Sequence, residues 1–339
     1  MMLLWSIPAV VVMSLLMTAG LRRYALARSV IDVPNARSSH TVPTPRGGGV
    51  AIVLTFLLSI AALMLSGAEH INTLVALGGG GALIAIIGFM DDHGHIAARW
   101  RLLGHFFAAG WILVWMGGLP PLQVLSWTLD LGMLGSLVAA IYLVWLLNLY
   151  NFMDGIDGIA SVEAITACLS AAFLYWLTGF DGLAVLPLML AAAVAGFLYW
   201  NFPPAKIFMG DAGSGFIGII LGGLSLQAAW ISPTMFWCWL ILLGVFIVDA
   251  TYTLARRLLR GDKVYEAHRS HAYQFASRQY GRHLPVTLAV IALNLGWLLP
   301  VALCVVQFGL DGLLGVIVAY IPLVALAVRY RAGELENRH

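Results

Sequence analysis

Charged residues are scarce in this sequence. They make up only 10% of its 339 residues, whereas hydrophobic residues make up 61%. A soluble globular domain carries about 25% charged residues, because water must solvate its whole surface. The scarcity of charge therefore excludes an ordinary soluble enzyme or binding domain, and it predicts a polytopic membrane protein.

The low net charge, the few cysteines and the lack of basic residues at the start of the chain exclude further classes of protein. The net charge is only +2 and no continuous basic tract is present, which argues against a nucleic acid partner. Three cysteines, Cys168, Cys238 and Cys304, lie in apolar runs without the spacing of a disulfide framework or a metal site. No basic residue precedes the first apolar run, and Arg22 and Arg23 follow it. A cleavable signal peptide is therefore not expected.

Long apolar runs dominate the chain instead. A helix that crosses a membrane needs about 17–25 residues, and helices are expected because an open sheet edge would leave backbone groups unsatisfied in lipid. The sequence thus predicts an all-α fold of about eleven transmembrane helices, which form a single domain over residues 1–339. The eleven runs are 2–20, 47–66, 71–90, 102–118, 131–150, 159–178, 182–201, 213–231, 234–255, 284–307 and 311–328.

The basic residues give the expected orientation. If the N-terminus lies outside, all 18 Lys and Arg residues fall on the inner side, in the segments 21–46, 91–101, 151–158, 202–212, 256–283 and 329–339. The outer turns then carry only acidic charge, at Glu69, Asp130, Asp181 and Asp311. Because cytoplasmic loops are enriched in Lys and Arg, we predict an outer N-terminus, a cytoplasmic C-terminus and an active site built from the short inner segments.

Acidic residues gather at the predicted inner ends of the helices. A carboxylate at mid-membrane costs about 2.5–3.5 kcal/mol, and neighbouring carboxylates repel one another unless a cation lies among them. One such residue alone is explained as a solvated charge at a loop edge, but five on one face predict a cation site. Mg²⁺ suits such a site, because it takes few carboxylates together with substrate phosphates. The five are Asp91, Asp92, Asp154, Asp157 and Asp211.

The residues around these aspartates form recognisable patterns. Asn148, Asn151, Asp154 and Asp157 follow one another in steps of three, which places them near one face if the helix persists that far. Asp211 begins a predicted helix, whose free N–H groups would favour a bound phosphate.

Three other features have mainly structural interpretations. The quartet 78–81 consists of glycines and predicts a close helix crossing. Asp249, inside a predicted span, is expected to pair with Arg256 or Arg257. The first inner loop, 32–49, is polar and rich in proline and glycine. It is either a basic anchor to anionic lipid or a border of the substrate cleft.

With these motifs the chain resembles the polyprenyl-phosphate N-acetylhexosamine-1-phosphate transferase family, and within it the transferases that begin O-antigen synthesis. The resemblance covers roughly residues 30–285, with the motifs in the family's order. Two departures are His95, where some relatives have a third Asp, and a looser spacing of the histidines in the fourth loop. The matching elements are the Asp91-Asp92 pair, the motif from Asn148 to Gly158, the motif from Phe208 to Ser214, and the loop with His268 and His271.

The resemblance implies a reaction in the bacterial inner membrane. An N-acetylhexosamine-1-phosphate would pass from a UDP-sugar to undecaprenyl phosphate, with release of UMP. Mg²⁺, or Mn²⁺ in its place, would be held chiefly by Asp211. Asp91 is the candidate base with Asp92 beside it, although a purely electrostatic role for Asp91 stays open. Asp154 and Asp157 complete the expected catalytic set.

The resemblance also implies contacts with the substrates. Asn151 and Asn201 would hold the nucleotide together with Asp154 and Asp157, and Phe208 would stack on the uracil ring. The phosphates and the sugar would contact Arg101, His268, Arg269 and His271. Simpler interpretations stay open: Arg99 and Arg101 also suit positive-inside anchoring, Phe208 is also an ordinary membrane aromatic, and the two histidines also suit a solvated loop. The identity of the amino sugar (GlcNAc, FucNAc, QuiNAc or another) and the formation of a homodimer are not determined by the sequence.

Two other functions compete with this one. An ion-coupled transporter also carries acidic residues in its membrane domain, but they should lie near mid-membrane in broken helices. A CDP-alcohol phosphotransferase also joins a nucleotide diphosphate to lipid chemistry, but its Asp spacing differs from the spacing in this chain.

The predicted orientation can be tested directly. A reporter protein fused after His339 should lie in the cytoplasm, because the positive-inside rule places the last basic segment there. Reporter activity on the outer side would contradict the eleven-helix prediction and the common face of the five aspartates.

Overall fold

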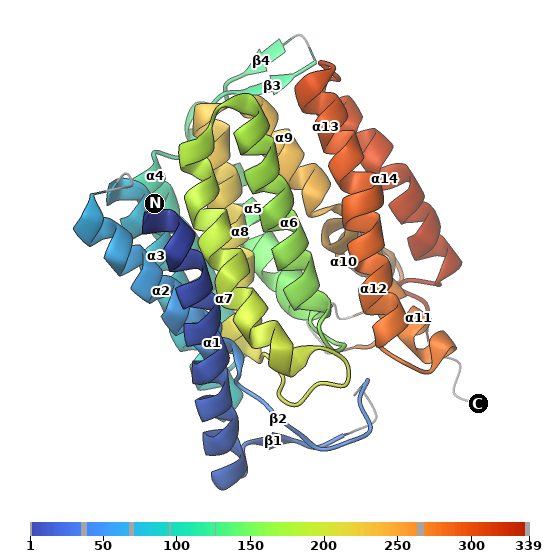
Figure 1. Cartoon of the computed structure of the whole chain (residues 1–339). Coiled ribbons are helices and arrows are strands. Elements are labelled where there is room, and N and C mark those ends of the chain that lie inside the picture. The colour runs from blue at the N-terminus through green and yellow to red at the C-terminus, as the bar shows by residue number, and fades with distance from the viewer. Residues whose placement is uncertain are drawn as a thin grey trace.

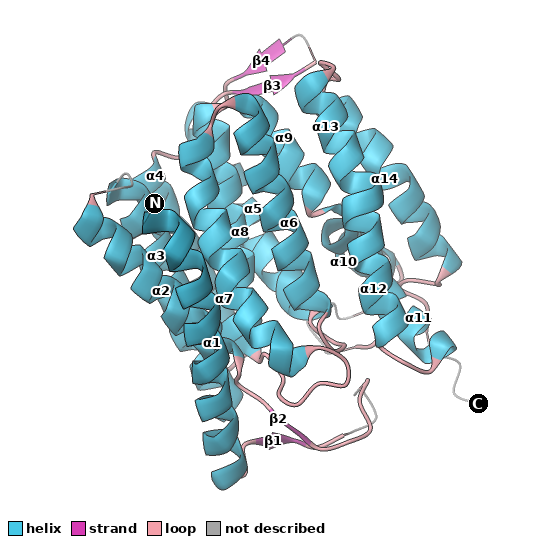
Figure 2. Ribbon diagram, in the orientation of Figure 1, coloured by secondary structure: helices cyan, strands magenta, loops and turns pink. Residues whose placement is uncertain are grey.

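The computed structural model describes residues 2–34, 39–67, 71–94, 96–125, 127–262 and 268–335. Two residues singled out above, Glu69 and His95, lie outside these ranges. Helices make up most of the described chain and strands very little of it (Figure 2), which confirms the all-α prediction. The long helices run side by side in one bundle (Figure 1).

The elements of the first half are α1 Met2–Ala27, β1 Ile31–Asp32, β2 Thr44–Pro45, α2 Gly49–Ser66, α3 Ile71–His93, α4 Ala98–Met116, β3 Leu122–Val124, β4 Trp127–Leu129, α5 Gly132–Met153 and α6 Ile159–Thr178. Those of the second half are the 3₁₀ helix η1 Asp181–Ala184, α7 Val185–Asn201, α8 Asp211–Ile231, α9 Pro233–Leu242, α10 Gly244–Leu259, α11 Ala272–Tyr280, α12 Leu284–Leu293, the π-helix η2 Asn294–Leu298, α13 Leu299–Gln307 and α14 Gly312–Arg329. The strands form two short antiparallel pairs, β1 with β2 and β3 with β4.

Each of the eleven predicted apolar runs lies on this helical framework. Nine described helices are long and apolar enough to cross a membrane, and α9 with α10 forms a tenth candidate that bends by 68°. The run 102–118 corresponds to α4, which is not among these ten. Arg99, Arg101 and His105 lie in its first turns and lower its hydropathy.

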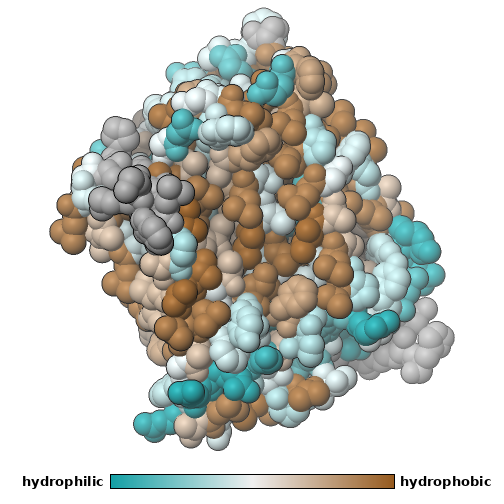
Figure 3. Space-filling model, in the orientation of Figure 1, coloured by the Kyte–Doolittle hydropathy of each residue, from teal (hydrophilic) through white to brown (hydrophobic). Residues whose placement is uncertain are grey.

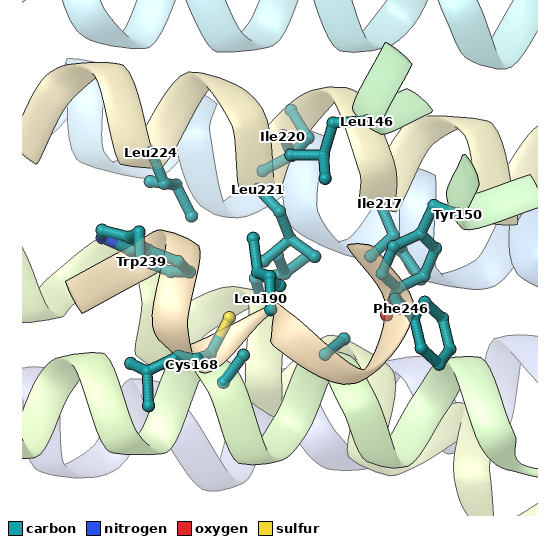
Figure 4. Close-up of a cluster of buried hydrophobic side chains, with 14 of the residues drawn as sticks. Leu146, Tyr150, Cys168, Leu190, Ile217, Ile220, Leu221, Leu224, Trp239 and Phe246 are labelled. Atoms are coloured by element: carbon teal, nitrogen blue, oxygen red, sulfur yellow. The ribbon is translucent and has the colours of Figure 1, made fainter. Parts of the chain in front are cut away.

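Helix α8 lies at the centre of the bundle. It is apolar on all sides, as expected for a helix that neighbours surround completely, and nearly all its residues are buried. Figure 4 shows Ile217 and Leu221 of this helix among side chains of other helices, including Tyr150 of α5 and Phe246 of α10. Because α8 begins at Asp211, its central position places that aspartate where several helices end.

Polar residues collect at the ends of the bundle. In the space-filling view, apolar side chains form a broad band across the middle, and polar side chains gather at the lower end near β1 and β2 (Figure 3). Hydrogen bonds join the loops at this end: His283 Nε2 lies 3.0 Å from the carbonyl oxygen of Ser39, and the Tyr273 hydroxyl donates to the Phe152 carbonyl at 3.0 Å. The five aspartates therefore share one end of the bundle.

Glycines allow α3 to approach its neighbours closely. A Cβ atom added at Gly80 would lie 2.6 Å from Ile112 of α4, and one at Gly81 would lie 2.6 Å from Phe216 of α8. The predicted close helix crossing at the glycine quartet is confirmed. At Gly88 the same atom would lie 2.6 Å from the backbone of Asp211 and Ala212, and backbone atoms cannot rotate away as side chains do.

Replacing Gly88 by Ala should therefore push the end of α3 away from the start of α8. We expect a loss of about 1–3 kcal/mol of stability, as is usual for an overpacked core, measured as a lower thermal unfolding midpoint in detergent. Gly110→Ala in α4 is the matched control, because no atom lies within 4 Å of its added Cβ. Equal unfolding midpoints for the two variants would contradict this account of the contact.

Candidate active site

Asp92 joins α3 to α8. Its side chain is only 4% exposed, and its two oxygens accept the backbone N–H groups of Asp211 and Ala212, each at 3.3 Å. A carboxylate in this position stabilises a helix N-terminus by pairing otherwise free donors and by its interaction with the helix dipole. The expectation that these N–H groups bind a phosphate was therefore wrong, because Asp92 already occupies them.

Arg101 lies between Asp91 and Asp211. Its Nη1 atom forms an ion pair with Asp91 and lies 3.7 Å from Oδ2 of Asp211. Asp91 also accepts the backbone N–H of Ile96 at 2.8 Å, and its side chain is 9% exposed. Asp211 is more accessible, with 41% of its side chain exposed. Of the three carboxylates at this point, Asp211 is thus the one most open to a ligand.

Helix α5 ends before its motif does. The helix stops at Met153, so the steps of three continue on a helical face only as far as Asn151. Asn151 Nδ2 donates to Asp211 Oδ1 at 3.0 Å and to Ser214 Oγ at 2.9 Å. The amide of Asn148 donates to the Val144 carbonyl at 2.6 Å. Asn148 lines a cavity of about 170 Å³ beside Asp91 and Asp211, whereas Asn151 contacts Asp211 directly.

Asp154 and Asp157 lie in the turn after α5. Burial, together with the negative charges of Asp211, Asp92 and Asp157, raises the pKa of Asp154 well above its usual value. A cation bound among these groups would oppose that rise.

Asp157 lies 3.1 Å from His283 Nδ1 and accepts the Ala205 N–H at 3.0 Å. Burial alone would lower the pKa of His283, but the hydrogen bond to Asp157 and its charge raise the pKa above the usual value. Through Asp157 and Ser39, His283 joins the α5–α6 turn to the first inner loop.

Asn201 and Phe208 flank the loop between α7 and α8. The Asn201 side chain accepts the Gly158 N–H and donates to the Ile207 carbonyl, both at 3.0 Å, so its amide braces two loops. The ring of Phe208 meets that of His40 edge to face, with 4.8 Å between centroids. Both Asn201 and Phe208 line a polar cavity of about 400 Å³.

The histidine loop is packed away from this cavity. His271 is 1% exposed, and its Nδ1 lies 3.3 Å from Oδ1 of Asp249. The His268 ring stacks on it, and burial, then the neighbouring His271 and Arg257, lowers the pKa of His268 to about 3. Among the described residues that line the cavity, Gln274 is the one from this region, whereas His268, Arg269 and His271 are not among them.

Asp249 has different partners from those expected. Its carboxylate accepts the N–H groups of Ala272 at 2.9 Å and Tyr273 at 3.0 Å, besides its contact with His271. Arg256 pairs with Glu334 at 3.0 Å, and Arg257 lies 3.5 Å from Asp262. The expected pairing of Asp249 with these arginines was therefore wrong: Asp249 caps α11 and orients its first residues.

Asp211 borders three cavities, and two of them, of about 400 and 170 Å³, differ in character. The larger, of about 400 Å³, is lined mainly by polar residues that include Asp92, Asn151, Asp154 and His283. The smaller, of about 170 Å³, is lined by Asp91 and Arg101 at one end and by Ile84, Ile87, Leu102 and Leu147 elsewhere. Both include Asp211, so a polar ligand and an amphipathic ligand can meet there.

The described residues contain no group of three or more His, Cys, Asp or Glu side chains placed to hold a metal by themselves. Mg²⁺ needs no such cage, because it retains waters and binds one or two carboxylates together with substrate phosphates. Asp211 meets this requirement, since its exposed carboxylate faces a cavity that Asp92 and Asp154 also line. The donor set at this point is thus compatible with Mg²⁺.

Four residues of the site were missed by sequence reasoning. His40, Arg46, Gln274 and His283 all line the larger cavity. Arg46 had a usable signal, because it stands alone between prolines and a glycine run directly before a span. His40 and His283 lie in loops and Gln274 lies in the first turn of α11. Nothing in the local pattern distinguishes these three residues.

Comparison with known proteins gives a consistent result. The family model described as glycosyl transferase family 4 matches residues 74–229, which include the aspartates of the site. A probable undecaprenyl-phosphate N-acetylglucosaminyl 1-phosphate transferase of Bacillus subtilis is 29% identical over 265 residues, covering 76% of this chain and 73% of that protein.

Mycobacterial proteins are also similar. The decaprenyl-phosphate N-acetylglucosaminephosphotransferase of Mycobacterium tuberculosis is 30% identical over 230 residues, covering 62% of this chain. The protein of the same name from Mycolicibacterium smegmatis is 29% identical over 237 residues. The matches span 57% and 56% of these two relatives, a little over half of their length.

The capping role of Asp92 gives a prediction about stability. Asp92→Ala removes the acceptor for two N–H groups of α8 and should cost about 0.5–2 kcal/mol, the usual range for a helix cap. Asp92→Asn is the matched control, since its amide oxygen still accepts one of the two hydrogen bonds. Thermal unfolding in detergent should place the Ala variant below the Asn variant. An Ala variant as stable as the Asn variant would contradict the cap.

Proposed function

We propose that the chain belongs to glycosyl transferase family 4, whose model matches residues 74–229, and that it transfers an N-acetylhexosamine-1-phosphate from a UDP-sugar to undecaprenyl phosphate. The observation that carries this proposal is the position of Asp211 between a polar cavity and a partly apolar one. The two substrates have matching characters, since one is a water-soluble nucleotide and the other a phosphate on a hydrocarbon chain.

The reaction is a phosphoryl transfer. An oxygen of the lipid phosphate attacks the β-phosphorus of the UDP-sugar, and a new P–O bond forms. The bond from that phosphorus to the oxygen shared with the α-phosphate breaks, and UMP leaves with this oxygen and its electron pair. The product is undecaprenyl diphosphate that carries the sugar. Catalysis of such a transfer depends mainly on positioning and on stabilising the charge on the phosphoryl oxygens.

The aspartates divide into different roles. Asp211 would hold Mg²⁺, or Mn²⁺ in its place, and the bound ion would supply charge neutralisation at the phosphates. Asp92 fixes the backbone of Asp211 through the cap of α8. Asp91 is committed to Arg101 and to the Ile96 N–H. This supports the electrostatic role for Asp91 over that of a base.

The nucleotide would occupy the larger cavity. Phe208 supplies an aromatic ring there for the uracil. Asp154 and Asn151 line the same cavity together with Asp211. Asp157 and Asn201 brace the loops of this cavity through Ala205 and Gly158. His271 and His268 lie behind the cavity, so we assign this loop an indirect role through the adjoining Gln274.

The protein would act in the bacterial inner membrane with this site facing the cytoplasm, where UDP-sugars are made. The positive-inside pattern supports that orientation. The ion-coupled transporter is disfavoured, because the five aspartates lie at one end of the bundle and not at its middle.

The proposed reaction can be tested by UMP release. Purified protein with undecaprenyl phosphate, Mg²⁺ and a panel of UDP-N-acetyl sugars should release UMP with at least one of them. Asp211→Asn should lower the rate by at least about 100-fold, the usual effect of losing one electrostatic group at a reacting centre. Asp181→Asn is the control, because Asp181 begins η1 at the other end of the bundle. No UMP release from wild-type protein with any sugar would overturn the proposal, and a fully active Asp211→Asn variant would exclude Asp211 as the metal ligand.

A further inference from the structure

We propose that Arg46 binds the diphosphate of the nucleotide sugar, and that Arg101 binds the phosphate of the lipid acceptor. This division between two arginines rests on the proposed function and adds a substrate-binding residue from the first inner loop. Two observations support this division. Each arginine lines a different cavity, and each is held beside the aspartates by its own contacts.

Backbone pairing holds Arg46 in place. The segment around it runs alongside the loop before α8: Phe208 N–H donates to the Pro45 carbonyl at 2.8 Å, and Gly48 N–H donates to the Phe208 carbonyl at 2.9 Å. Gly49 N–H donates to the Met209 carbonyl at 2.8 Å. Arg46 is thus fixed relative to the loop that carries Phe208 and ends at Asp211.

The Arg46 side chain pairs with Asp92 and keeps further donors for a ligand. Its Nη2 donates to the backbone carbonyl of Asp92, and its Nε lies 4.0 Å from the Asp92 carboxylate. An arginine has five N–H donors, and the hydrogen bond to Asp92 is the one described for this guanidinium. The side chain is 39% exposed. A planar fork with free donors at a cavity wall is suited to a phosphate.

The cavities separate the two arginines. Arg46 lines the polar cavity of about 400 Å³, together with Phe208 and Asp211. It also lines the adjoining open cavity of about 430 Å³, which contains Asp91, Asp92 and Asp211. Arg101 lines neither of these. A nucleotide stacked on Phe208 would therefore extend its diphosphate past Arg46 before it reached Asp211.

Arg101 belongs to the other side of Asp211. It comes from α4 and lines the smaller cavity with Leu102 and Leu147. A phosphate on a hydrocarbon chain fits this lining, since its head group can meet Arg101 while its first carbons contact the apolar side chains. Arg101 also lies 3.7 Å from Asp211 Oδ2, so the acceptor phosphate would lie next to the metal ligand.

The charge balance explains why two arginine side chains are needed besides the divalent cation. Asp91, Asp92, Asp154 and Asp211 surround the point where two anionic substrates meet. One divalent cation leaves much of the repulsion between these carboxylates and the phosphates uncompensated. One guanidinium for each substrate lowers this repulsion and orients the two phosphates toward each other.

The test compares the two substrates in single variants. Arg46→Gln should raise the KM for the UDP-sugar by about 10- to 100-fold, as expected for the loss of a charge-assisted hydrogen bond. Its KM for undecaprenyl phosphate should stay within about twofold of wild type. Arg101→Gln should show the opposite pattern. Arg46→Lys, which retains the charge, should recover part of the affinity for the UDP-sugar.

Arg99→Gln is the matched control, because Arg99 is an exposed arginine two residues from Arg101 and lies over the Trp100 ring. A second measurement does not depend on turnover. Calorimetric binding of UDP and of uridine should show that Arg46→Gln weakens UDP selectively and leaves uridine binding unchanged.

The outcomes distinguish the proposals. If Arg46→Gln changes both KM values equally, or weakens uridine as much as UDP, the residue only supports the loop and the inference is wrong. An unchanged KM for the UDP-sugar also overturns it. Failure of the proposed function appears earlier, as absent UMP release in wild-type protein, and UDP binding still tests Arg46 in that case.

Discussion

The hydrogen bonds between the Asp92 carboxylate and the first N–H groups of α8 hold this site together. They connect the end of α3 to the start of the central helix, and they fix the backbone of Asp211. The close approach at Gly88 brings the two helices near enough for this contact. Every other group of the site is placed relative to that junction: Arg101 and Asn151 by their contacts with Asp211, and the polar cavity by the loop before α8.

The same device occurs a second time in the molecule. Asp249 of α10 accepts the first N–H groups of α11, as Asp92 of α3 accepts those of α8. In both places a buried carboxylate on one helix caps another helix, and backbone dipoles offset part of its charge. The capped helix is thereby oriented by a side chain of a packed neighbour. Acidic residues in such a chain thus serve two purposes, since some bind ligands and others join helices.

Sequence reasoning predicted the helical framework well, because long apolar runs in lipid leave few structural alternatives. Sequence reasoning also predicted that Asp91, Asp92, Asn151 and Asp211 lie at one end of the bundle, since each stands at the end of a span. Sequence reasoning failed to predict the hydrogen-bond partners of individual side chains. Asp249 was assigned to arginines nearby in sequence, but the backbone N–H groups that it accepts lie more than 20 residues away. His283 was missed for the same reason, because its role arises from contacts between distant loops.

One of these contacts, between His283 and Ser39, has a consequence for biosynthesis. Helices of a membrane protein are inserted in order as the chain is made, and the five aspartates have all been synthesised once α8 begins. The hydrogen bond from His283 to the first inner loop joins residues 244 positions apart. The nascent chain therefore carries its acidic cluster through the synthesis of α8 to α11 before His283 can add this contact. Until then the backbone pairs of Gly48 and Gly49 with Phe208 and Met209 can already hold the end of this loop beside the aspartates.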